Sequence, residues 1–288
     1  YVLKDGEVVD VVDSNKAEVD AIQHKMVGRE VDKEYYREQK QQPYSADTVL
    51  VEFDDVSIPG SYSNMSFKLH PGEVLCLVGT EGSGREAIIR TIFGLESPQS
   101  GSVTIKGQSV SRFTAQNGVG NGIGYIPRER KVEGIVGGMN VFENMTLSQM
   151  GNYSNTGVLR VSEEKSLARD WISKLAIKTP NEFKDCGGLS GGNQQKVVLA
   201  KWRSSGADII LLDHPTRGLD IGAKEDVYDM VRDMSDDGVG IILIADTLEE
   251  AIGLAHTIIV VKDGVAQKYF DCEPGSKPTP FDLVHHMI

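Results

Sequence analysis

The sequence predicts an α/β fold with a largely parallel central sheet, and three apolar runs carry this prediction. Residues 74–79, 207–213 and 239–245 are continuous apolar stretches, which is typical of strands buried on both faces. Each run is followed by a turn or loop and then by a segment with helical periodicity. Strands that alternate with helices favour a parallel sheet covered by helices.

The composition is that of an ordinary globular protein. Of the 288 residues, 40% are hydrophobic and 25% are charged, and the formal net charge is −12. This acidic balance argues against a dedicated nucleic-acid-binding surface. The three cysteines are scattered, which fits a reduced compartment and matches no zinc motif. Because the sequence has no long apolar span, the chain is not expected to cross a membrane by itself.

The two ends of the sequence repeat one pattern. Short strands are expected on both sides of Asp5-Gly6 and on both sides of Asp263-Gly264. The Asp-Gly dipeptide is typical of hairpin turns. We interpret this as an internal repeat, with two unrelated hairpins as the alternative. Residues 1–34 are then the tail of a preceding domain, and the chain is expected to be a fragment of a longer polypeptide. Residues 35–46 are polar and aperiodic, which is typical of a linker.

The main domain is expected to span residues 47–288, and a glycine-rich turn stands near its start. Antiparallel strands are predicted at 48–53 and 65–69, where apolar and polar residues alternate. After the apolar run at 74–79 the chain reads Gly79-Thr80-Glu81-Gly82-Ser83-Gly84-Arg85-Glu86 and then opens a helix at 87–93. A strand, a glycine-rich turn and a helix in this order are typical of a phosphate-binding loop.

The loop pattern requires lysine at the position of Arg85 and serine or threonine at the position of Glu86. Arginine keeps the positive charge, but its planar fork differs from the point charge of lysine. The Glu86 carboxylate offers no small hydroxyl to Mg²⁺ and repels phosphate. The segment is therefore either a working phosphate cradle or a loop that kept its shape and lost its tight hold on nucleotide.

The middle of the chain predicts more strands and a helical region. Strands are expected at 101–106 and 122–126, and Pro127-Arg128-Glu129-Arg130-Lys131 follows the second as a basic turn. Helices are expected near 140–149 and 162–176.

The stretch Leu189-Ser190-Gly191-Gly192-Asn193-Gln194-Gln195-Lys196 opens a strongly patterned helix. Ser190 is a good N-cap residue, and two glycines follow it although glycine is a poor helix former. Bare backbone amides at a helix N-terminus form an anion site, which gives one reason for the glycines. The alternative is a capped helix whose glycines only ease packing.

The apolar run at 207–213 ends in Asp213 and continues as His214-Pro215-Thr216-Arg217-Gly218-Leu219-Asp220. Together with LSGGNQQK, it resembles the signature motif, Walker B strand and D-loop of ABC transporter ATPases. LSGGNQQ followed by PTRGLDIGAK most resembles the second nucleotide-binding domain of monosaccharide importers, which carry two ATPase domains in tandem on one chain. The resemblance covers nearly all of the sequence.

The resemblance implies a P-loop NTPase fold of the ABC ATPase type, with a mixed sheet core, an antiparallel β subdomain and a helical subdomain at about 132–188. In the family the helical subdomain docks the membrane subunits. We favour a small internal core, over a docking surface, for the apolar residues of its first helix, which are Val141, Phe142, Met145 and Leu147.

The resemblance also implies a site shared between two domains, with ATP held between the phosphate loop of one and the signature of the other. The residues expected at ATP in this chain are Gly79, Thr80, Glu81, Gly82, Ser83, Gly84, Arg85, Glu86, Ser190, Gly191, Gly192, Gln194 and Asp220. Asp213 is the expected Walker B carboxylate and Mg²⁺ ligand. Tyr62 lies two residues later than the aromatic residue that stacks on adenine in the family.

Five positions depart from the family pattern within one site. They are the loop lysine and hydroxyl, now Arg85 and Glu86, the Q-loop residue, now Arg128, the catalytic glutamate, now His214, and the switch histidine, now Asp246. A neutral imidazole can act as a base near pH 7, so His214 is a weak catalytic candidate. Phosphoryl transfer, however, needs metal, base and charge clamps together. Asp246 is interpreted as the N-cap of the helix that follows it.

The prediction is therefore a degenerate second ATPase domain of an ABC importer for simple sugars. It donates its signature to ATP and Mg²⁺ held mainly by the preceding domain of the same chain. Further expected partners are transmembrane permease subunits and, indirectly, a periplasmic or lipoprotein sugar-binding protein, with no nucleic acid. The expected location is the cytoplasmic face of the membrane, as a peripheral subunit.

Three alternatives stay open from the sequence. In the first alternative, both ATP sites of the two-domain protein are active, and His214 is the base of the second site. In the second alternative, the cargo is a nucleoside or a sugar-like signal molecule. The sequence does not decide between these and simple sugars, because an ATPase domain never touches cargo. The third alternative is a non-transport scaffold with an ABC fold, which would have no need of a phosphate-facing Ser-Gly-Gly.

Overall fold

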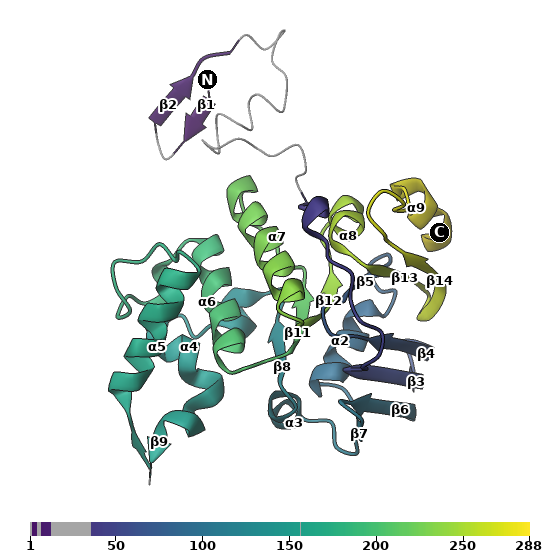
Figure 1. The fold of residues 1–288 in the computed structure, drawn as a ribbon, viewed down its shortest axis with the longest axis horizontal. Coiled ribbons are helices and arrows are strands. Elements are labelled where there is room, and N and C mark those ends of the chain that lie inside the picture. The colour runs from purple at the N-terminus through teal and green to yellow at the C-terminus, as the bar shows by residue number, and fades with distance from the viewer. Residues whose placement is uncertain (1, 5–6, 13–35, 156) are drawn as a thin grey trace.

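A six-stranded sheet forms the centre of the main domain (Figure 1). The computed structural model describes residues 2–4, 7–12, 36–155 and 157–288. The strand order is β14-β13-β5-β12-β11-β8, and every neighbouring pair except β13–β14 is parallel. The strands are β5 (Val74–Val78), β8 (Ile123–Ile126), β11 (Ile209–Asp213), β12 (Gly240–Ile244), β13 (Thr257–Lys262) and β14 (Val265–Asp271). All residues of β5, β11 and β12 are buried, which confirms the three apolar runs as core strands.

An antiparallel sheet lies at one side of this core (Figure 1). Its order is β4-β3-β6-β7, with β3 (Val51–Ile58), β4 (Tyr62–Leu69), β6 (Ser100–Ile105) and β7 (Gln108–Ser109). The alternation read at 48–53 and 65–69 is confirmed as the pair β3–β4, whose facing rings of Phe53 and Phe67 stack with centroids 4.8 Å apart. The mixed sheet core and the antiparallel subdomain are thus both present.

Helices pack against the core sheet, and all but the C-terminal one lie in connections between its parallel strands. They are α2 (Arg85–Phe93), α3 (Ala115–Gly120), α6 (Gly191–Ser204), α7 (Ile221–Asp236), α8 (Leu248–Leu254) and α9 (Pro280–Met287). The helix expected at 87–93 is confirmed as α2, which begins two residues earlier. No helix in the described part of the chain is long and apolar enough to cross a membrane.

Short helical elements form a separate group on the side of the core opposite the antiparallel sheet (Figure 1). They are the π-helical turn η2 (Arg130–Gly134), α4 (Val141–Thr146), the 3-10 segment η3 (Leu147–Tyr153), the small hairpin β9 (Ser154–Asn155) and β10 (Val158–Leu159), α5 (Val161–Lys174) and η4 (Cys186–Gly188). Val141, Phe142 and Met145 are buried here, which confirms a small internal core, whereas Leu147 is 38% exposed. The helix expected to continue to Gln149 ends at Thr146 instead, because Gln149 leaves the helical region of backbone angles.

Both expected hairpins are present. β1 (Val2–Lys4) and β2 (Glu7–Asp10) pair antiparallel, as β13 and β14 do. In the second hairpin, Asp263 and Gly264 both have positive φ, which the tight turn requires. Asp5-Gly6 of the first hairpin and residues 13–34 of the predicted tail lie outside the described residues.

Residues 36–42, which we name the strap, lie on α7 and α8. The strap contains the 3-10 turn η1 (Glu38–Lys40). Its Arg37 is buried, and the Nε atom donates to Asp229 at 2.9 Å. Arg232 of α7 is 1% exposed and donates to the backbone carbonyl of Arg37 and to two carbonyls of α8. The polar stretch read as a linker is therefore anchored to the domain that follows it.

A buried histidine makes the stability of the fold depend on pH. The Nδ1 atom of His256 accepts from the backbone N–H of Val74 at 3.0 Å, so Nε2 carries the proton and donates to the carbonyl of Gln42 at 2.8 Å. Burial lowers the pKa of His256 from 6.5 to about 4. The neutral ring is thus the form that the folded state favours.

We expect the stability that this neutral ring contributes to be complete above pH 6.5 and to be lost as the pH falls from 6.5 to about 4. The loss attributable to His256 is about 3 kcal/mol, at 1.36 kcal/mol per pKa unit. Urea unfolding at pH 7 and pH 4 measures it, with His256→Asn as the comparison. The wild type should lose about 3 kcal/mol more than the variant, and equal losses would contradict the assignment.

Candidate functional site

The phosphate loop joins β5 to α2, as the sequence predicts. Gly82 and Gly84 have φ values of 81° and 96°, in the region that favours glycine. A Cβ on Gly84 would lie 2.3 Å from the carbonyl oxygen of Ser61, so the loop cannot accept a larger residue there. Thr80, Glu81 and Gly82 are exposed, and the N-terminus of α2 follows directly.

The loop offers donors that the chain itself does not use. Within the described part of the chain, the backbone amides of Gly82, Gly84, Arg85 and Glu86 have no acceptor. Ser83 is 2% exposed and its hydroxyl has no partner. This hydroxyl lies inside the loop, because a Cβ on Gly79 would come within 2.5 Å of it. Amides at a helix N-terminus and a buried hydroxyl together fit a phosphate group.

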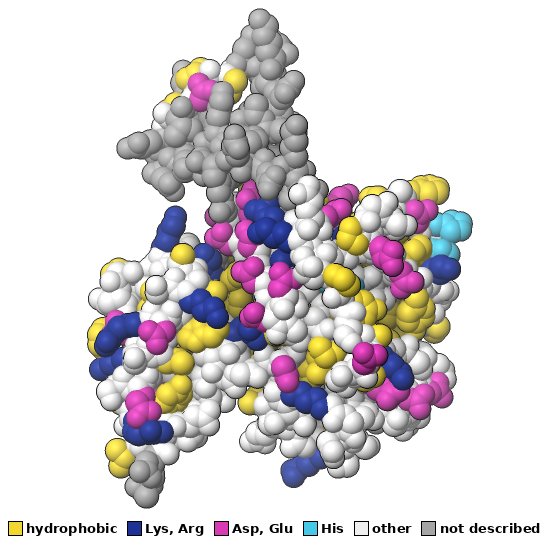
Figure 2. All heavy atoms as spheres, in the orientation of Figure 1, with side chains coloured by type: hydrophobic (Ala, Val, Ile, Leu, Met, Phe, Trp, Pro, Cys, Tyr) yellow, Lys and Arg dark blue, Asp and Glu magenta, His cyan; other side chains and the backbone are white. Residues whose placement is uncertain are grey.

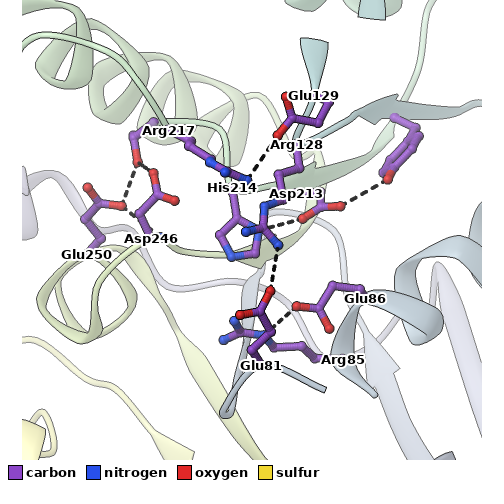
Figure 3. Close-up of polar contacts among 12 residues, drawn as sticks. Glu81, Arg85, Glu86, Arg128, Glu129, Asp213, His214, Arg217, Asp246 and Glu250 are labelled. Atoms are coloured by element: carbon purple, nitrogen blue, oxygen red, sulfur yellow. Dashed lines mark hydrogen bonds and ion pairs between the residues drawn. The ribbon is translucent and has the colours of Figure 1, made fainter. Parts of the chain in front are cut away.

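Two carboxylates of the loop are paired with arginines. Arg85 Nε donates to Glu86 Oε1 at 3.1 Å, and both side chains are partly buried. Arg128, which follows β8, reaches toward the loop, and its Nη1 lies 3.8 Å from Glu81 Oε1 (Figure 3). The Glu81 side chain is 89% exposed, so this second pair is weak.

Asp213 ends β11 and is held by two neighbours. Its Oδ1 lies 2.6 Å from Nδ1 of His214, and its Oδ2 accepts from the hydroxyl of Tyr125 at 3.1 Å (Figure 3). Burial and the adjacent carboxylate raise the pKa of Tyr125, so the phenol remains a donor. His214 has a φ of 50°, uncommon for a residue other than glycine. With Nδ1 directed at Asp213, Nε2 is the nitrogen that remains available as an acceptor.

The residues of this site do not fit Mg²⁺. Both oxygens of Asp213 already accept from protein donors, and the Glu86 carboxylate is paired with Arg85. The hydroxyl that would ligate the metal is missing, and Arg128 places a positive charge where an oxygen ligand is needed. Among the described residues, no cluster of three or more His, Cys, Asp or Glu side chains could hold a metal ion.

The switch position is part of a polar cluster, and its interpretation as an N-cap is wrong. Thr247 caps α8, because its hydroxyl accepts from the backbone N–H of Glu250 at 3.2 Å. Asp246 precedes the cap, and its Oδ2 lies 2.8 Å from the hydroxyl of Thr216, on the segment after β11. Asp246 therefore contacts the segment that leads to the D-loop (Figure 3).

Glu250 is the centre of this cluster. It is 3% exposed and accepts from the Tyr228 hydroxyl at 2.7 Å and from Lys224 Nζ at 3.0 Å. The hydroxyl of Thr216 also lies 2.8 Å from its second oxygen, and the N–H of Asp246 donates to the same oxygen. One buried carboxylate thus connects α7, α8 and the segment after β11.

Ser190 is exposed and begins α6, although its side chain caps no backbone amide. Its Oγ instead accepts from the side-chain amide of Asn193 at 2.8 Å. A hydroxyl that accepts in this way keeps its own proton for another acceptor. The backbone amides of Gly191 and Gly192 likewise have no acceptor among the residues that the structure describes.

The two signature glycines also have a packing role. A Cβ on Gly192 would lie 2.8 Å from the Cβ of Ala223, and one on Gly191 would lie 2.5 Å from the guanidinium of Arg130. The packing interpretation of these glycines is supported, and it does not exclude the anion-binding one. Both need a bare backbone at the start of α6.

Two of the expected ATP residues support the backbone. Gln194 is 1% exposed, and its amide is directed at the carbonyls of Cys186 and Gly187 at 3.3 and 3.4 Å, which argues against direct contact with nucleotide. Asp220 is exposed and caps α7 by accepting from the N–H of Ala223 at 2.8 Å. Tyr62 is 1% exposed in the core, so it does not stack on adenine.

The structure brings the loop, Arg128, Asp213, His214 and Asp246 together at the C-terminal ends of parallel strands (Figure 3). Ligand sites in open α/β sheets are typical of this edge. Within the described residues, no hydrogen bond or ion pair joins the signature to the loop. The chain thus presents two half-sites, one at the loop and one at the start of α6.

A family model described as "ABC transporter" matches residues 62–217, from β4 to the segment after β11. The chain belongs to the ABC transporter family. A ribose import ATP-binding protein, RbsA, of Bacillus subtilis is 35% identical over 263 residues, 91% of this chain and 52% of that protein. The protein of the same name from Roseobacter denitrificans is 34% identical over 286 residues, 99% of this chain and 54% of that protein. The chain therefore spans about half the length of these curated relatives.

Solved ABC transporter cassettes share the fold. The cassette MJ1267 gives a TM-score of 0.70 at 17% identity, over 83% of this chain and 99% of that one. A dimeric post-hydrolysis state of the cassette MJ0796 gives 0.65 at 20% identity, over 77% and 99%. These likenesses confirm the predicted P-loop ABC ATPase fold.

Sequence reasoning missed two residues of this ABC transporter site. Tyr125 donates to Asp213 from the neighbouring strand, and Glu250 collects the donors around the switch position. Tyr125 belongs to an ordinary apolar strand pattern, and Glu250 lies in the first turn of a short helix, where acidic residues are common. Neither has a local signal that would have identified it.

Proposed function

We propose that this chain is the second of two tandem ATPase domains in an ABC importer for simple sugars. The names of the relatives support the cargo class, and the share of their length that the chain covers supports a second domain of similar size. The repeated hairpin pattern at the two ends of the sequence supports the same arrangement. Nucleosides and sugar-like signal molecules remain alternative cargoes, because an ATPase domain does not contact the cargo and its sequence does not distinguish them.

The proposed role of the domain is to donate its signature to ATP held by the phosphate loop of the preceding domain. The contrast between its two half-sites carries this proposal. Ser190 is exposed with its proton available, and two free amides follow it. At its own nucleotide site, the positions expected to bind metal are Glu86 and Asp213, and both carboxylates are paired with other side chains. A scaffold without ATP chemistry would have no reason to keep the first arrangement.

In this mechanism the hydroxyl of Ser190 donates a hydrogen bond to an oxygen of the γ-phosphate. The backbone amides of Gly191 and Gly192 donate hydrogen bonds to the same phosphate group. ATP supplies the phosphoryl group, and Mg²⁺ belongs with the loop of the preceding domain. Donors that are fixed before the reaction stabilise the charge that develops on the phosphate. The loop of the present chain contributes no catalytic step.

The proposed assembly includes the preceding domain, permease subunits in the membrane and, through them, a periplasmic or lipoprotein sugar-binding protein. The domain would then be a peripheral protein at the cytoplasmic face of the membrane. Its helical group at 130–188 is the proposed permease contact, in which exposed apolar side chains such as Val132 and Phe183 are available.

Steady-state turnover of Mg-ATP tests the proposal directly. The chain alone is expected to hydrolyse ATP at less than about 1% of the rate of the two-domain protein, because it lacks the partner loop. A phosphate-release assay at equal molar concentration measures both rates. Turnover by the chain alone at the two-domain rate would overturn the role of signature donor.

A further inference from the structure

The loop of this chain has unused donors on several sides. Arg85 gives Glu86 only its Nε, and its two Nη groups have no partner among the described residues. Arg128 has a buried Nε without a partner, and its Nη1 makes one long contact with Glu81. The loop itself adds its free amides and the buried hydroxyl of Ser83, and Arg128 reaches this loop through its contact with Glu81 (Figure 3).

Such a set of donors matches phosphate oxygens. Arginine binds phosphate through its planar fork and is charged at any physiological pH. The exposed Glu81 can leave Arg128 at little cost, since a pair at 3.8 Å on the surface contributes little. A phosphate chain entering the loop would therefore exchange a weak contact for charge-assisted hydrogen bonds.

The same loop has no place for magnesium. Asp213 accepts from His214 and Tyr125, and Glu86 replaces the hydroxyl ligand. The two arginines instead bring positive charge to the loop, where each contacts a loop carboxylate (Figure 3). We infer that the phosphate loop of this chain binds a nucleoside triphosphate without Mg²⁺, with Arg85 and Arg128 in place of the metal.

This inference rests on the proposed function only in treating the domain as a nucleotide-binding one. The chain can bind a nucleoside triphosphate without Mg²⁺ even if it does not donate its signature to the partner loop, and it can donate its signature without such binding. Binding is therefore measured on this chain alone, without turnover.

Calorimetric titration with ATP tests the inference in two buffers of equal ionic strength, one with excess Mg²⁺ and one with EDTA. We expect the affinity in EDTA to be at least as high as in Mg²⁺. A Kd ten times lower in Mg²⁺, or no binding in either buffer up to millimolar ATP, would overturn the inference.

Variants assign the effect to the two arginines. Arg128→Ala should weaken binding in EDTA by about tenfold, which is typical of one lost charge-assisted contact. Arg169→Ala is the matched control, because Arg169 is an exposed arginine of the helical group paired with Glu182, and its Kd should not change. Thermal unfolding of each free variant shows that it is folded.

The double variant Arg85→Lys with Glu86→Thr restores the lysine and the hydroxyl of the phosphate-loop pattern. We expect it to gain a preference of at least about tenfold for Mg-ATP over free ATP, because the threonine hydroxyl is a magnesium ligand. A double variant with the same response to Mg²⁺ as the wild type would show that these two positions do not determine the metal requirement.

Discussion

Replacing Ser190 with arginine is expected to lower ATP hydrolysis by the two-domain protein by at least about 100-fold, as the loss of a preorganised donor does in other enzymes. Ser190 is the exposed residue that begins α6, and its proton is available because Oγ accepts from Asn193. Arginine removes this short donor and places a long side chain where the phosphate of the partner loop would approach. The free amides of Gly191 and Gly192 would then be covered.

The measurement is phosphate release by purified two-domain protein in saturating Mg-ATP. Ser111→Arg is the matched control, because Ser111 is an exposed serine in the segment before α3 and the same charge is added there. The control should keep the wild-type rate. A Ser190→Arg protein that also keeps it would refute signature donation by this chain.

His214 distinguishes the asymmetric mechanism from one with two active sites. Asp213 holds Nδ1, and this leaves Nε2 oriented as a base, which is the observation that favours a second active site. Under the mechanism proposed here, His214→Ala changes turnover by less than about twofold, since the residues of this site do not fit the Mg²⁺ that phosphoryl transfer requires. A tenfold loss in the same assay would favour the second active site.

Most of the fold could be predicted from local sequence pattern. Continuous apolar runs identified β5, β11 and β12 because strands buried on both faces leave a strong signal. The loop and the start of α6 were found because glycines at the beginning of a helix serve few purposes. Helix ends were less accurate, as in α4, where the chain changes to a 3-10 turn without a proline or glycine to mark it.

The contacts within the site were less predictable, because they join residues that are far apart in the sequence. Asp246 was read as an N-cap from its place before a helix, but Thr247 is an equally good cap one residue later and takes that role. Gln194 was expected at the nucleotide because it lies near Gly191 and Gly192 in the signature, yet the helix turns it into the core. Helical periodicity gives the angle between successive side chains around the helix axis, but it does not show which face of the helix is exposed to solvent.

The cluster around Glu250 leads to a prediction about the stability of the fold. Glu250→Ala is expected to lower the free energy of unfolding by about 3–5 kcal/mol, the usual effect of removing one partner from a buried charged pair. The carboxylate is 3% exposed, so water cannot replace it. Its removal leaves the buried hydroxyl of Tyr228 and the ammonium group of Lys224 without their acceptor.

Urea unfolding at pH 7 measures this change, and Glu249→Ala is the control. Glu249 is the preceding residue in the same first turn of α8 and is exposed, so its replacement should change stability by less than about 0.5 kcal/mol. Equal effects of the two substitutions would show that Glu250 contributes only its place near the helix N-terminus. A large difference would show that the buried carboxylate of Glu250 has a structural role, because it connects α7 and α8 through Thr216 to the segment before the D-loop.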